Sequence, residues 1–97
     1  MTTILPLLAF IVATSVAVIG ACGPRGVMVE KLARVYGEVS QGGGLTNGRL
    51  IVLVELYVNK ETGTWTLVQT YPSGIACIMV AGNNWRSNPL VVPGVDT

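Results

Sequence analysis

The chain has 97 residues, with six basic and five acidic side chains and no histidine, so its formal net charge at pH 7 is +1. A charge this close to zero provides no attraction for nucleic acid or for an anionic membrane surface. The lack of histidine removes the commonest general base and metal ligand at neutral pH, and the acidic residues are scattered along the sequence. We therefore expect a protein that is not an enzyme, with no catalytic residue, no metal, no cofactor and no nucleic-acid partner.

The first 24 residues contain no charged side chain and are mostly apolar. The apolar stretch at 4–21 is close to the lower limit of the roughly 17 to 25 residues that cross a bilayer as a helix. A proline within the stretch, hydroxyl residues in its middle and Gly20-Ala21 at its end favour a cleaved export signal over a retained anchor. A basic segment at the N-terminus, which such signals normally have, is missing. We predict a signal peptide at 1–21, cleaved near Ala21, and an exported, periplasmic protein.

The chain has two cysteines, Cys22 and Cys77. The sequence Ile-Gly-Ala-Cys at 19–22 also fits the pattern after which a bacterial lipoprotein is acylated on its first mature cysteine. Acylation of Cys22 would leave Cys77 unpaired, whereas two cysteines in an exported chain usually pair. We favour a disulfide, and a membrane-anchored lipoprotein is the alternative. Membrane contact is expected only through the leader or through a lipidated Cys22.

Removal of the signal leaves about 76 residues, enough for one small domain. We place this domain at 22–85 and a flexible C-terminal tail, rich in turn-forming residues, at 86–97. A helix is predicted at 24–36, with Pro24 in its first turn and Gly37 ending it in the left-handed conformation. Apolar residues at helical spacing form its buried stripe, namely Met28, Leu32, Val35 and Tyr36.

Alternation of side chains predicts strands at 49–58, 64–71 and 75–80, separated by short turns. The polar, glycine-rich stretch at 38–45 is compatible with a further short edge strand. Consecutive strands joined by short turns pair antiparallel. We therefore predict an α+β fold in which an N-terminal helix packs on a three- to four-stranded antiparallel β-meander, with the helix start linked by the disulfide to the last strand.

Five stretches of the sequence resemble, in the same order, a group of short exported proteins of unknown function from alphaproteobacterial genomes. They are Cys-Gly-Pro-Arg at 22–25, Leu-Ala-Arg-Val-Tyr-Gly-Glu at 32–38, Gly-Leu-Thr-Asn-Gly at 44–48, Glu-Thr-Gly-Thr-Trp-Thr at 61–66 and Cys-Ile-Met-Val-Ala-Gly-Asn-Asn-Trp at 77–85. In that group a cysteine near the mature N-terminus and a second in the last strand are usual, which implies that Cys22 and Cys77 pair. This chain differs from the group at Asn83, where an acidic residue is expected.

Glu55, Tyr57 and Trp85 are the candidate residues of a binding surface. Glu55 interrupts an otherwise apolar strand face that includes Tyr57. It is either a polar anchor for a ligand or, as we favour, a charge on the outer face that limits aggregation. Trp65 is expected in the core, whereas Trp85, near a turn, is equally compatible with the core and with an interface.

The function expected from these residues is binding rather than catalysis. We predict a non-catalytic periplasmic protein-binding or envelope-associated accessory protein, whose partner in the cell envelope and whose oligomeric state the sequence does not specify. A small-molecule or glycan-binding module is the alternative. A flat apolar outer face would favour a protein partner, and a concave pocket with convergent polar groups would favour a ligand.

Overall fold

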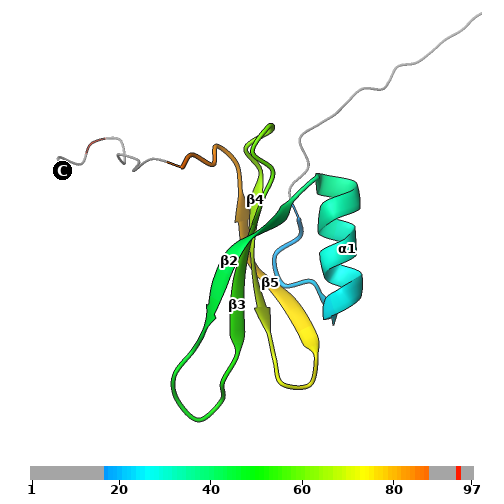
Figure 1. The fold of residues 1–97 in the computed structure, drawn as a ribbon, viewed down its shortest axis with the longest axis vertical. Coiled ribbons are helices and arrows are strands. Elements are labelled where there is room, and N and C mark those ends of the chain that lie inside the picture. The colour runs from blue at the N-terminus through cyan, green and yellow to red at the C-terminus, as the bar shows by residue number, and fades with distance from the viewer. Residues whose placement is uncertain (1–16, 88–93, 95–97) are drawn as a thin grey trace, which may run out of the picture.

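The computed structural model describes residues 17–87 and residue 94. The described elements, in chain order, are β1 (Cys22–Pro24), α1 (Arg25–Tyr36), β2 (Val39–Leu45), β3 (Leu53–Val58), β4 (Trp65–Thr70) and β5 (Ile75–Gly82). The five strands form one antiparallel sheet in the order β1-β5-β4-β3-β2, and α1 lies against one of its faces (Figure 1). The α+β fold and the meander from β2 to β5 are confirmed. Most of the predicted leader and most of the predicted tail lie outside the described residues.

The predicted strand count and the predicted position of the helix are wrong. β2 is a complete edge strand of seven residues, and β1 is an additional strand of three residues that precedes the helix. All side chains of β2 are exposed, so backbone pairing with β3 holds the strand and no apolar alternation marks it. Pro24 has an extended backbone with φ of −56° and ψ of 137°, which places it in β1 and starts the helix at Arg25.

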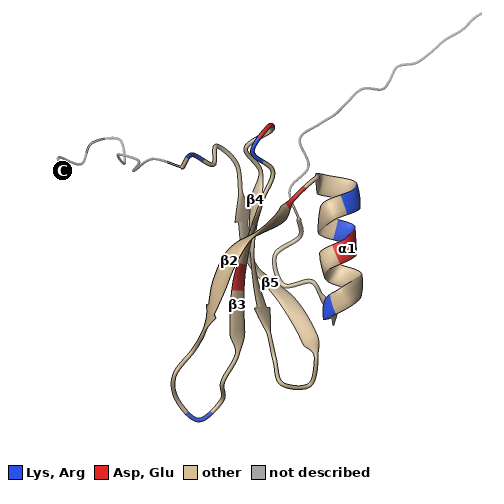
Figure 2. Cartoon of the chain, in the orientation of Figure 1, with Lys and Arg blue, Asp and Glu red and all other residues tan. Residues whose placement is uncertain are grey.

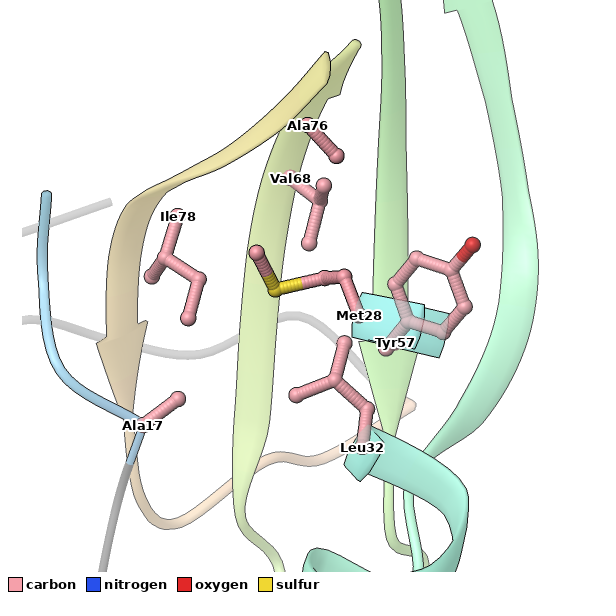
Figure 3. Packing of buried hydrophobic residues seen from close by; sticks show 7 residues of the cluster. All are labelled: Ala17, Met28, Leu32, Tyr57, Val68, Ala76 and Ile78. Carbon is pink, nitrogen blue, oxygen red and sulfur yellow. The ribbon is translucent and has the colours of Figure 1, made fainter. Parts of the chain in front are cut away.

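The helix buries a narrower stripe than its spacing predicts. Met28 and Leu32 are buried and Tyr36 is half-buried, whereas Val35 is 59% exposed. Gly37 ends α1 with φ of 66°, as predicted, and its N–H donates to the carbonyl of Ala33 at 3.1 Å. The buried residues of α1 meet side chains of β3, β4 and β5 in one small core (Figure 3). Its members are Ala17, Met28, Leu32, Tyr57, Val68, Ala76 and Ile78.

A disulfide joins Cys22 and Cys77, which lie directly opposite each other in β1 and β5 with their Cα atoms 4.0 Å apart. The predicted pairing is therefore confirmed, although it links β1 rather than the helix start to the last strand. The cysteines are 55 residues apart in sequence. On the chain-entropy model, closing a loop of this length stabilises the fold by about 4 kcal/mol, which is a large share of the stability of so small a domain.

Alternate residues of the strands point to two different faces of the sheet. On β4, Thr66, Val68 and Thr70 are buried on the side of α1, and the intervening residues point away from it. We call the side under α1 the covered face. Among residues 17–87 no helix or strand lies on the opposite side, which we call the open face (Figure 1). The register assigns to the open face Val39, Val54, Leu56, Val58, Trp65, Leu67, Gln69 and Val80, of which Val58 is 1% exposed.

Candidate functional site

A charged cluster connects the first residue of α1 to the middle of β3. Arg25 donates from Nε and Nη2 to the two carboxylate oxygens of Glu55, at 3.0 and 2.9 Å, and the Tyr57 hydroxyl donates to Glu55 Oε1 at 3.0 Å. Glu55 is 9% exposed and Tyr57 is 1% exposed, both on the covered face. The interpretation that places Glu55 on the outer face is therefore wrong. Glu55 is the charged residue of the described strands, and Figure 2 shows a red, acidic segment within β3.

Gly43 leaves room for this cluster. It lies opposite Glu55 in the pairing of β2 with β3. A Cβ atom at this position would collide with the carbonyl oxygen of Val54 and lie 3.0 Å from Cγ of Glu55. The sequence shows a run of three glycines here and indicates only flexibility. In the structure, one of them is required by the close approach of the β3 backbone at Val54, with the Glu55 side chain next to it.

The electrostatics of the cluster favour one protonation state. Burial, followed by the hydrogen bond to Glu55, raises the pKa of Tyr57 to about 12. The hydrogen bond to Glu55 also raises the pKa of Arg25. At neutral pH the Tyr57 phenol is therefore neutral and the Arg25 guanidinium is charged. Both groups donate their hydrogen bonds to the Glu55 carboxylate within the cluster. The arrangement attaches the first residue of the helix to the middle of the sheet.

The other end of the helix is attached to the turn between β3 and β4. The Asn59 side chain donates from Nδ2 to the carbonyl of Tyr36 at 3.0 Å, and its Oδ1 accepts from the N–H groups of Glu61 and Thr62 at 2.9 and 3.1 Å. One amide thus satisfies a C-terminal carbonyl of the helix and organises the turn. Sequence reasoning did not single out Asn59, because its partner lies 23 residues away.

Trp65 and Trp85 form a pair at the side of the open face. Their ring centroids are 6.5 Å apart with a tilt of 58°. Trp65 Nε1 donates to the carbonyl of Asn83 at 3.1 Å, and the Trp85 N–H donates to the carbonyl of Gly63 at 2.9 Å. Both side chains are half-buried. The prediction that Trp65 lies in the core is therefore wrong. Of the three candidate residues, Glu55 and Tyr57 are brought together on the covered face, whereas Trp85 lies apart from them and packs on Trp65.

A cavity of about 220 Å³ lies between α1, β5 and the chain that precedes β1. Most of its lining is apolar, including Ala17, Leu32 and Ile78, and the ionisable side chains that line it are Lys31 and Tyr36. Two such groups do not make the convergent set of polar contacts that orients a polar ligand, so the cavity suits a mainly apolar molecule. The cavity was not foreseen, since its walls come from separate parts of the sequence.

Glu38 is a further buried acid that sequence reasoning did not select. It directly follows the helix cap and is 1% exposed. Its N–H donates to the carbonyl of Leu32 at 2.9 Å, while neither carboxylate oxygen has a hydrogen-bond partner among the described residues. In the same part of the chain, no group of three or more His, Cys, Asp or Glu side chains could hold a metal ion. None of the helices described is long and apolar enough to cross a membrane.

No protein-family model, curated protein or solved structure matches this chain. The function therefore has to be argued from the geometry of the two faces, the charged cluster and the cavity.

Proposed function

We propose that the protein is an exported, non-catalytic module that binds a protein partner in the cell envelope through the open face of its sheet. The observation that carries this proposal is the unequal polarity of the two faces. The residue with a net charge in the five strands, Glu55, lies under the helix, and the open face presents mainly aliphatic and aromatic side chains, with the uncharged Gln69 among them.

An antiparallel sheet covered on one side normally buries its apolar face and exposes its polar one. Here Leu56, Trp65 and Leu67 point away from the helix and remain half-exposed, flanked by Val39 and Val80, which are 56% and 36% exposed. Covering such side chains releases roughly 25 cal/mol per Å² of apolar area, and tryptophan is enriched among the residues that dominate interfaces. A mainly apolar sheet face whose strand residues carry no charge fits a partner that is itself apolar and uncharged at the contact.

The disulfide supports the exported location in this proposal. Disulfides persist in the periplasm and other oxidising compartments and are rare in the cytosol, where thiols are kept reduced. The cross-strand pair Cys22 and Cys77 would not form stably in a reducing compartment. It is also incompatible with acylation of the Cys22 thiol, because the same sulfur cannot carry both bonds. The resemblance to short exported proteins agrees with this location.

The open face can be tested by site-specific photocrosslinking in the periplasm of a Gram-negative host. A photoreactive residue at Val80 is expected to give a discrete adduct, and the same residue at Val35, on the exposed side of α1, is expected to give none. Adding Leu67→Lys should abolish the adduct by placing a charge in the contact, while the matched change Val35→Lys should leave it intact. An adduct that is equally strong from both positions, or that survives Leu67→Lys in a folded protein, would contradict the proposal.

The cavity favours a second candidate, binding of a small apolar molecule. Its apolar lining does not suit a glycan, whereas the Lys31 ammonium could pair with the acid group of a short fatty acid. Native mass spectrometry with octanoate as the probe tests this function. Saturable binding of one octanoate that is weakened at least tenfold by Lys31→Met would support it, and no binding at millimolar probe would exclude this ligand class.

A further inference from the structure

We infer that residues 17–21 are part of the mature folded domain, so that export cleavage takes place before Ala17 and not after Ala21. This inference rests on the exported location in the proposed function. It moves the processing site that the sequence predicts, and it assigns to the last residues of the leader a role in the structure.

The first observation is the burial of Ala17. It is 3% exposed and belongs to the core together with Met28, Leu32 and Ile78 (Figure 3). Ala17 also lines the cavity between α1 and β5. Cleavage after Ala21 would remove this wall and open the buried side chains of the helix and of β5 to water.

The second observation is backbone pairing. The N–H of Gly20 donates to the carbonyl of Ile78, and the N–H of Ile78 donates to the carbonyl of Ala21, both at 2.8 Å. These bonds continue the antiparallel pairing of β1 with β5 beyond the position where Cys22 lies opposite Cys77. A chain that began at Cys22 would end this pairing at the disulfide and leave both backbone groups of Ile78 without these partners.

The third observation is the turn at 18–21. The N–H of Ala21 donates to the carbonyl of Val18 at 3.2 Å, and Gly20 has φ of 89°. A glycine with positive φ at the third position is what a type II turn requires. Gly20, which suggests a peptidase site in the sequence, is therefore explained by the geometry of the folded chain.

The sequence contains a suitable cleavage site upstream. The uncharged apolar run at 4–12 has a length within the roughly 7 to 15 residues of a signal's hydrophobic region, and Ala13-Thr14-Ser15 follows with small residues at the two positions that a signal peptidase reads. Cleavage after Ser15 gives a mature chain that starts at Val16. Cys22 is then internal, so its thiol is available for the disulfide and the chain has no N-terminal cysteine to acylate.

The intact mass of the protein recovered from the periplasm of a Gram-negative host tests the cleavage position directly. A mass that starts at Val16 and gains two hydrogens on reduction is the expected result. A mass that starts at Cys22 would overturn the inference and leave export standing. A full-length, unprocessed chain in the cytoplasm would overturn both the inference and the exported location.

A matched pair of glycine variants tests whether the segment stabilises the mature protein. At both Gly20 and Gly23 an added Cβ would meet no atom within 4 Å, but only Gly20 has a positive φ. Gly20→Ala in the exported protein is expected to lower Tm by about 4–8 °C, because alanine is strained in that conformation, while Gly23→Ala leaves it nearly unchanged. Equal Tm values for the two variants would show that the turn is absent from the mature fold.

Discussion

The two faces of the sheet are built by alternate residues of the same strands, and they differ in polarity. On the covered face, Glu55, Thr66 and Thr70 lie buried under α1, whereas the open face presents Leu56 and Leu67. The helix is therefore not placed by hydropathy alone. The bidentate contact of Arg25 with Glu55 and the amide of Asn59 hold its two ends, so specific hydrogen bonds select the face that is covered. The apolar surface left on the other face is then available to a partner.

The strongest test of this comparison is a pair of valine truncations, one on each face. Val68→Ala removes a side chain that is 0% exposed under the helix and is expected to lower the free energy of unfolding by about 2 kcal/mol. Val80→Ala removes a partly exposed side chain of the open face and should lower the free energy of unfolding by less than about 0.5 kcal/mol. Urea denaturation of both variants measures the difference. A cost for Val80→Ala as large as that for Val68→Ala would mean that the open face is covered within the chain.

A second test compares a partly buried ion pair with an exposed one. Glu55→Gln removes the charge that Arg25 and Tyr57 contact and is expected to lower the free energy of unfolding by about 1–2 kcal/mol. The expected loss is modest because the Arg25 side chain is 41% exposed, so that water screens the pair. Glu30→Gln breaks the exposed pair of Glu30 with Arg34, whose atoms are 3.9 Å apart, and should cost at most about 0.5 kcal/mol. The same urea titration measures both. Equal costs would show that the charged cluster does not anchor the helix.

A further effect, confined to alkaline conditions, is expected from pH. The pKa of Tyr57 is about 12 in the folded chain against 10.0 for an ordinary tyrosine, so the folded state holds the proton more tightly than the unfolded state. The resulting stability is fully present below pH 10 and is lost as the pH rises toward 12. The urea midpoint of the wild type should therefore fall more steeply over this range than that of Tyr57→Phe. Parallel curves for the two proteins would contradict a buried, hydrogen-bonded phenol.

Local patterns predicted the parts of the fold that depend on local interactions. The spacing of Met28 and Leu32 and the stop at Gly37 identified the helix, and the turns identified the meander of β3, β4 and β5. The two cysteines identified their own pairing. β1 escaped prediction, and 38–45 was expected at most as a short edge strand, because backbone hydrogen bonds to neighbouring strands of the sheet hold both segments and their side chains carry no alternation.

The assignment of faces and of the site could not be made from the sequence. Both sides of β3 are apolar except at Glu55, so alternation does not say which side the helix covers. The partner that decides it, Arg25, lies 30 residues earlier in the chain. The pairing of Trp65 with Trp85 depends likewise on how the chain after β5 returns to the turn at Gly63. These contacts join distant parts of the chain and leave no trace in local composition.

The cross-strand disulfide also determines how the molecule responds to mechanical tension. A force that stretches the chain between residues 17 and 87 passes from Cys22 through the sulfur atoms to Cys77 and bypasses everything between them. The helix and β2, β3 and β4 therefore lie inside a closed covalent loop that bears no load. A protein tethered by its N-terminus and pulled by its C-terminus would lengthen only by the residues outside this loop. Its central sheet and helix would add their length only after the disulfide is reduced.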